Sequence, residues 1–102
     1  MKVGLCDLAT LRQRGCAWVT GASSGIGASV SRRLVSQGWE VVGSARNKKK
    51  LDILGKELGD KFHPYPLDVT EAEAVRTKFA IIEAAHGPVS LAILNAGVYE
   101  IL

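Results

Sequence analysis

Glycines at positions 21, 25 and 27 form the string TGASSGIG, which runs from 20 to 27 between a short apolar segment and an amphipathic one. A glycine-rich turn between a strand and a helix can bind a dinucleotide. Gly21 would permit the tight turn, Gly25 would let a diphosphate approach the backbone, and Gly27 would let the helix pack closely on the sheet. The unpaired amides of the helix N-terminus would then face the phosphates. The alternative is a plain strand-to-helix turn that uses glycine for its shape alone.

A second feature with chemical meaning lies about 20 residues further on, where enzymes that use NAD place an acid to hold the ribose 2′-hydroxyl. Here the segment reads GSARN over 43–47 and contains no acid. Arg46 could grip a 2′-phosphate through paired hydrogen bonds, whereas a carboxylate would repel it. The lysines at 48–50 add positive charge. We therefore predict NADP in preference to NAD, although these lysines can also be read as the solvated first turn of a helix.

Four apolar segments are predicted to be the strands that position these turns: Cys16–Val19, Trp39–Ala45, Phe62–Leu67 and Val89–Leu94. Amphipathic segments separate them, so the strands must be parallel and the crossovers helical. Two prolines in the third segment restrict it to an edge of the sheet. The prediction is an α/β fold, a partial Rossmann-like doubly wound sheet of about four strands in the order 3-2-1-4 with three helices.

Local signals predict where the three helices begin and end. The first spans Gly25–Gln37 and stops at Gly38; the second begins after an N-cap at Asn47 and stops at Gly59; the third opens with a capping box at 70–73 and ends at Gly87. The inward-facing residues are predicted to be Ile26, Val30 and Leu34 in the first helix, Leu51, Leu54 and Leu58 in the second, and Val75, Phe79 and Ile82 in the third.

The glycine string resembles the TGxxxGxG motif of the classical short-chain dehydrogenase/reductase family. Two more segments match that family in order and spacing, LDVT at 67–70 and NAG at 95–97, so the resemblance covers roughly residues 15–100. It implies that Asp68 accepts a hydrogen bond from the adenine amino group, that the Val69 amide faces the ring, and that 95–97 line the cofactor ribose. Asp68 can alternatively be a turn residue beside Thr70. The candidate cofactor-binding residues are Gly21, Ser23, Ser24, Gly25, Ile26, Gly27, Arg46, Asp68, Val69, Asn95, Ala96 and Gly97.

The family's catalytic residues, a Ser and a Tyr-x-x-x-Lys pair, are not found in these 102 residues. Tyr65 is followed four residues later by Val69, and Tyr99 lies three residues from the end. No catalytic residue is assigned, and His63 and His86 are expected at the surface or at strand edges. The resemblance implies that a full-length relative transfers hydride between NADP(H) and an alcohol or ketone, whereas this chain alone is expected to be inactive.

Two alternatives without catalysis remain: a free-standing nucleotide-binding module, and an interaction module. In the second, the exposed edge of the fourth strand would pair with another copy or with a partner chain.

Composition sets further limits on function. The chain has 102 residues, 47% of them hydrophobic and 23% charged, which excludes a disordered or low-complexity protein. The net charge is 13 − 10 = +3, but no aromatic residue lies among 46–50, so no nucleic-acid partner is expected. No apolar run approaches a membrane span. Cys6 and Cys16 lack metal-ligand spacing. We expect a cytoplasmic protein with an N-terminal arm at 1–14 and a partial dinucleotide-binding domain at 15–102.

Overall fold

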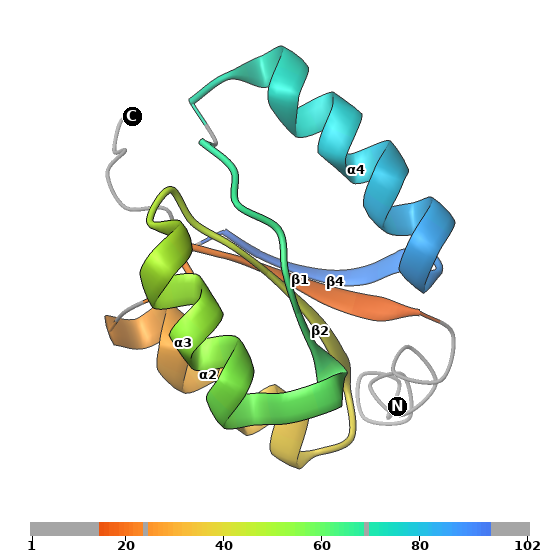
Figure 1. The fold of residues 1–102 in the computed structure, drawn as a ribbon. Coiled ribbons are helices and arrows are strands. Elements are labelled where there is room, and N and C mark those ends of the chain that lie inside the picture. The colour runs from red at the N-terminus through yellow and green to blue at the C-terminus, as the bar shows by residue number, and fades with distance from the viewer. Residues whose placement is uncertain (1–14, 24, 69, 95–102) are drawn as a thin grey trace.

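The fold, a computed structural model, is a four-stranded parallel sheet in the order β3-β2-β1-β4 with helices on both faces (Figure 1). The structure describes residues 15–23, 25–68 and 70–94. Its elements are β1 (Cys16–Thr20), α2 (Gly25–Ser36), β2 (Glu40–Ser44), α3 (Lys48–Leu58), the 3-10 turn η1 (Gly59–Lys61), β3 (Phe62–Pro64), α4 (Ala72–His86) and β4 (Val89–Leu94). The predicted strand order and fold class are confirmed. The proposed arm at 1–14 lies outside the described residues.

The two helical layers bury separate sets of apolar side chains against the sheet. In Figure 1, α2 and α3 lie on one face and α4 on the other. The core under α2 and α3 is centred on Val19, Val41 and Leu51, and the core under α4 on Trp18 and Ile82. All five residues of β1 are buried, as expected for a strand with neighbours on both sides and helices on both faces. None of the helices in the described part of the chain is long and apolar enough to cross a membrane.

The residues of α2 that face the sheet differ in part from those predicted. Its buried residues are Gly27, Ala28, Ser31 and Leu34, whereas Ile26 is 70% exposed. One residue corresponds to about 100° of rotation about a helix axis, so Gly27 can face the sheet only if Ile26 points elsewhere. The prediction of Ile26 as a core residue was therefore wrong. The Ser31 hydroxyl is satisfied in the core because it donates to the carbonyl oxygen of Gly27 at 2.9 Å.

Helix α3 follows the local signals closely. The Lys50 amide donates to Oδ1 of Asn47 at 3.0 Å, which is the predicted N-cap bond, and the helix ends at Gly59. Leu51 and Leu54 are buried, and Leu58 is partly buried against the same core.

The third strand is shorter than the predicted Phe62–Leu67, because β3 ends at Pro64. Pairing with β2 nevertheless continues at alternate residues: the Tyr65 amide donates to the Gly43 carbonyl oxygen at 2.8 Å, and the Leu67 amide to that of Ala45 at 3.0 Å. The prolines occupy the positions in between, where no amide is required by β2, so they are tolerated at this edge but interrupt the regular strand.

The start of α4 also differs from the prediction. The N-cap is Glu71, which makes no side-chain capping bond, and the predicted capping box of Thr70 with Glu73 does not form. The Thr70 hydroxyl instead donates to Oδ1 of Asp68 at 2.7 Å. Asp68 Oδ1 also accepts from the Thr70 amide at 3.0 Å, so Thr70 belongs to a local turn, and the helix begins one residue later than a cap at Thr70 would require.

Phe79 of α4 and the residues of β4 are more exposed to solvent than predicted. Phe79 was expected to face inward but is 42% exposed, with its ring centroid 6.0 Å from that of Trp18. Strand β4 has the predicted bounds, but its residues are half-buried or exposed. Within the described residues β4 pairs only with β1, so it forms an edge of the sheet.

Two glycines on either side of Phe62 predict opposite effects on stability. A Cβ atom at Gly43 would overlap the Phe62 ring and lie 3.1 Å from the Ala22 Cβ, whereas a Cβ at Gly55 would meet the ring at an ordinary 3.7 Å. We expect Gly43→Ala to lower the free energy of unfolding by about 1–3 kcal/mol. Gly55→Ala, within α3, should raise it by about 0.5–1 kcal/mol. Urea unfolding of both variants measures this, and equal effects would contradict the close packing at Gly43.

Candidate functional site

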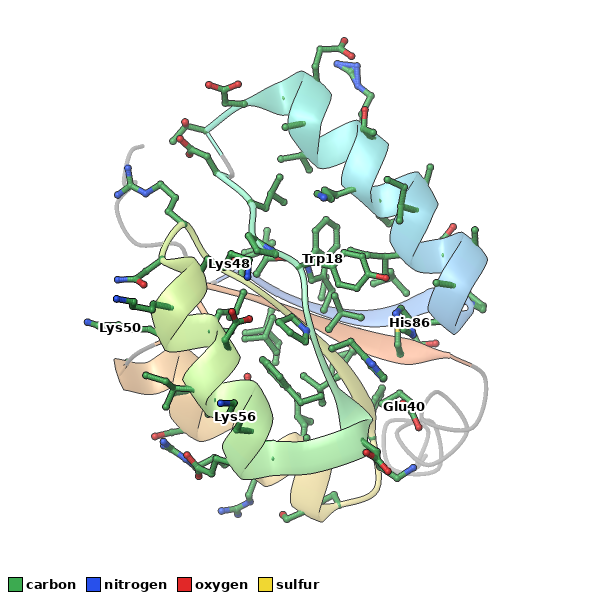
Figure 2. The ribbon with its side chains drawn as sticks, viewed as in Figure 1. Trp18, Glu40, Lys48, Lys50, Lys56 and His86 are labelled. Carbon is green, nitrogen blue, oxygen red and sulfur yellow. The ribbon has the colours of Figure 1, made fainter. Side chains whose placement is uncertain are left out.

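The carboxyl ends of the parallel strands bring three of the predicted segments to one edge of the sheet. The glycine turn follows β1, Arg46 follows β2, and Asp68 follows the segment that continues β3. In doubly wound folds, ligands bind outside this edge. Figure 2 shows Lys48 and Lys50 at the same end of the sheet, opposite His86 and Glu40.

The glycine turn is tied to the strands on both sides of β1. The Ala22 amide donates to the Ser44 carbonyl oxygen at the end of β2, at 3.1 Å. The Thr20 hydroxyl donates to the Ile93 carbonyl oxygen of β4, at 3.3 Å. Gly21 has φ = 66° and Gly25 has φ = 56°, left-handed conformations that favour glycine. These bonds fix where α2 begins relative to the sheet.

An open space lies beside the start of α2. A Cβ atom built on Gly25 would meet no heavy atom within 4 Å, although the φ of this residue already favours glycine. Gly25 and Ile26 are both exposed, and they form the first turn of a 12-residue helix that has no acidic residue in that turn. Unpaired amides and the positive end of the helix dipole favour an anion there. The backbone therefore leaves room for a diphosphate where the sequence predicted one.

Arg46 and Asp68 lie close enough to interact. The pKa of the Asp68 carboxyl is lowered mainly by the bond from the Thr70 hydroxyl, then by the Thr70 amide at 3.0 Å, and also by the positive charge of Arg46. Asp68 is thus both an acceptor at this edge and a turn residue beside Thr70. Arg46 is exposed, so its guanidinium is accessible to a ligand.

Two of the three lysines at the start of α3, Lys48 and Lys50, occupy different surroundings. Lys48 forms an ion pair with Asp52 at 2.9 Å, as expected for a solvated first turn. Lys50 instead lines an open pocket of about 120 Å³ together with Ser23 of the glycine turn. Arg32 also lines this pocket, but Glu57 neutralises it through a 2.7 Å ion pair. The pocket is smaller than the roughly 300 Å³ of small ligand sites, so it could contact only part of a cofactor.

The other predicted residues cannot be placed in this arrangement. Ser24, Val69, Asn95, Ala96 and Gly97 lie outside the described residues. Of those described, Gly21, Ser23, Gly25, Ile26, Arg46 and Asp68 are partly or fully accessible at the carboxyl edge, whereas Gly27 is buried under α2. The described residues include no group of three or more His, Cys, Asp or Glu side chains that could hold a metal ion.

One supporting contact was not predicted from the sequence. The indole Nε1 of Trp18 donates to the Ser44 hydroxyl at 2.9 Å, and both side chains are buried. This bond crosses from β1 to the last residue of β2, two residues before Arg46. No local signal predicts it, because the two residues are 26 positions apart.

Comparison with known proteins agrees with this geometry. The family model for short chain dehydrogenase matches residues 15–101. The chain belongs to the short-chain dehydrogenase family. Serine 3-dehydrogenase of Agrobacterium fabrum is 35% identical over 83 residues, which cover 81% of this chain and 33% of that relative. This member of the short-chain dehydrogenase family therefore spans about a third of the length of that curated relative.

Solved structures of other proteins show the same arrangement of elements. Actinorhodin polyketide ketoreductase, crystallised with NADPH, has a TM-score of 0.79 and 33% identity, over 85% of this chain and 34% of that one. A metagenomic short-chain oxidoreductase in complex with NADP has a TM-score of 0.73 and 38% identity, over 81% of this chain and 39% of that one. The described strands and helices thus correspond to a part of each of these longer chains.

Proposed function

We propose that this chain is the NADP-binding part of a short-chain dehydrogenase, with its partial dinucleotide-binding domain at 15–102. The observation that carries the proposal is the glycine turn, with open space at Gly25 and the first amides of α2 directly after it. The similarity to structures that contain NADP or NADPH supports the same ligand class. The diphosphate would lie over Gly25, with Gly21, Ser23, Ser24 and Ile26 around it and Gly27 setting the distance of α2 from the sheet.

The adenosine half would lie toward the ends of β2 and β3. Asp68 would accept a hydrogen bond from the adenine amino group and the Val69 amide would face the ring, while Asn95, Ala96 and Gly97 would line the ribose. A lowered pKa supports this role for Asp68, because the ionised carboxylate is the better acceptor.

A preference for NADP over NAD follows from the charges at this corner. No acid follows β2, and the exposed Arg46 guanidinium is available for a 2′-phosphate. Lys50, which faces the pocket beside Ser23, adds a positive charge, whereas the charge of Lys48 is engaged by Asp52.

Hydride transfer would require residues that these 102 do not contain, since no Tyr-x-x-x-Lys segment is present. We propose that a longer polypeptide carries out the reaction, between the nicotinamide of NADP(H) and an alcohol or ketone, and that this chain alone binds the cofactor without turnover. We also propose a cytoplasmic location.

The open space at Gly25 predicts a selective loss of binding. We expect Gly25→Ala to raise the dissociation constant for NADPH at least about tenfold, because the methyl group would occupy the path of the diphosphate. Isothermal titration calorimetry measures this. Gly59→Ala is the matched control, since Gly59 also has a positive φ, of 81°, and no neighbour within 4 Å of its Cβ, but lies after α3. Equal losses in both variants would point to backbone strain rather than to the site.

The charge of Arg46 predicts cofactor selectivity. We expect Arg46→Ala to weaken binding of NADPH about tenfold or more, because charge-assisted hydrogen bonds to the 2′-phosphate are lost, and to leave binding of NADH unchanged. Arg33→Ala is the control, because Arg33 is also exposed but lies in the last turn of α2. The preference for NADP would be wrong if the unaltered chain bound NADH as tightly as NADPH.

A second candidate function is an interaction module, which the position of β4 favours. Within the described residues β4 pairs only with β1, and Leu94 is 80% exposed. An unpaired strand edge can pair with its own copy about a two-fold axis. We propose a second copy as its partner.

This candidate makes a distinct prediction about mass. If β4 pairs with its copy, sedimentation velocity should give a dimer, and Ala92→Lys should restore the monomer because an edge lysine opposes strand pairing. Ala80→Lys, on the exposed face of α4, is the control. A monomeric unaltered chain that binds NADPH would favour the nucleotide-binding function alone.

A further inference from the structure

A group of titratable side chains lies at the opposite end of the sheet from the glycine turn. His63 of β3 and His86, the last residue of α4, stack with their ring centroids 4.2 Å apart and their planes inclined by 28°. Nε2 of His63 lies 2.7 Å from Oε1 of Glu40, and Nε2 of His86 lies 3.0 Å from the Tyr65 hydroxyl. Figure 2 shows His86 and Glu40 at the end where β1 begins. These side chains connect β2 and the β3 segment to the C-terminal end of α4.

Every element around this pair contributes a titratable group. Lys61 Nζ lies 3.1 Å from Oε2 of Glu40, Lys78 Nζ lies 5.9 Å from the centre of the Tyr65 ring, and Oε2 of Glu83 accepts from the Val89 amide at 2.9 Å. The groups are Cys16 from β1, Glu40 from β2, Lys61 from η1, Tyr65 from the segment after β3, and Lys78 and Glu83 from α4. Burial raises the pKa of the Cys16 thiol, and Glu83 and Glu40 act in the same direction, so the thiol stays neutral.

Helix α4 has few other attachments to the sheet. Ile82 is its one fully buried residue, while Ala74 and Val75 are only partly buried. Phe79 and Ile81 are 42% and 45% exposed. With so little apolar surface buried, contacts of the last helical turn contribute a large share of what holds α4 in place.

We propose that the stacked pair of His63 and His86 is an acid-sensitive contact, which holds the end of α4 against β3 near neutral pH and releases it in mild acid. Two neutral imidazole rings stack favourably. A proton taken up by His86 places positive charge against the His63 ring, in a partly buried site where that charge is poorly solvated.

The lowered pKa of His86 determines whether acid stabilises or destabilises the contact. Partial burial lowers the pKa of His86, and His63 lowers it further, whereas Glu40 opposes them. The folded chain therefore binds this proton less tightly than the unfolded chain does. The stabilisation is complete above the ordinary pKa of imidazole and is lost as the pH falls through the lowered pKa of His86. Glu40, whose pKa is lowered chiefly by its bond with His63, loses its own contribution only at more acidic pH.

Release of α4 would uncover the core beneath it. That core includes Trp18, Val42 and Leu67. Leu67 precedes Asp68, so mild acid would also loosen the segment that carries Asp68 at the other end of the sheet. This inference does not depend on the proposed function, because it concerns only how α4 is held.

The test uses the full chain, in which His63 and His86 are the only two histidines. Amide hydrogen exchange is measured at about pH 7.5 and about pH 5.5, and protection in α4 is expressed relative to protection in α3. The ratio removes the pH dependence of the intrinsic exchange rate, which both helices share. We expect protection in α4 to fall relative to α3 at the lower pH. Urea unfolding over the same range should show the unfolding equilibrium constant rising about twofold or more toward acid. His86→Gln should remove most of this rise, and the control Lys56→Gln, at an exposed lysine of α3, should leave it intact.

Two results would overturn the proposal. One is an unchanged ratio of α4 to α3 protection between the two pH values in the unaltered chain, which decides the matter even if His86→Gln does not fold. The other is the same pH dependence of unfolding in the unaltered chain and in His86→Gln, because the rise would then come from other groups.

Discussion

The bond from the Ala22 amide to the Ser44 carbonyl oxygen holds the glycine turn against the end of β2. It forms only because Gly43, beside Ser44, has no side chain: the Phe62 ring and the Ala22 methyl group occupy the space that a Cβ atom would need. The same short stretch of β2 therefore packs β3, positions the turn and leads directly into Arg46. Without this close approach the two halves of the candidate cofactor site would move apart.

The charged groups and the open space are concentrated at one edge of a well-packed frame. The core under α2 and α3 is continuous from Val19 to Leu51. The buried hydroxyl of Ser31 is hydrogen-bonded within α2, to the carbonyl oxygen of Gly27. Trp18 and Ser44 satisfy each other on the other face. Because these buried polar groups are hydrogen-bonded, the cost of removing them from water is offset, and rigid elements can position the exposed groups at the carboxyl edge.

Much of the frame could be predicted from local sequence signals. Asn47, Gly38 and Gly59 mark helix ends through capping and left-handed turns, and β4 has the bounds that its apolar run suggested. These features depend on neighbouring residues, which a sequence displays directly.

The predictions that failed depend on contacts between distant segments. Ile26 was predicted in the core because its spacing to Val30 and Leu34 fits one helix face. In the structure the face of α2 that packs on the sheet begins at the next residue, Gly27. Thr70 fits a capping box, yet the helix N-cap is Glu71 and Thr70 lies in a turn with Asp68. The stacked histidines come from segments 23 residues apart and carry no motif. The cofactor-binding roles of the candidate residues remain predictions. The structure places those candidates that it describes at the carboxyl edge of the sheet.

The register of β1 has a consequence for how the molecule assembles during synthesis. Of the described strands β1 is synthesised first and lies between β2 and β4, and it joins β4 with Cys16 opposite Val89. Its buried residues must therefore wait, half-paired at best with β2, until β4 has been synthesised. A pairing of such long sequence separation slows folding, and in the interval β1 is the segment most exposed to chaperones and to association with other nascent chains.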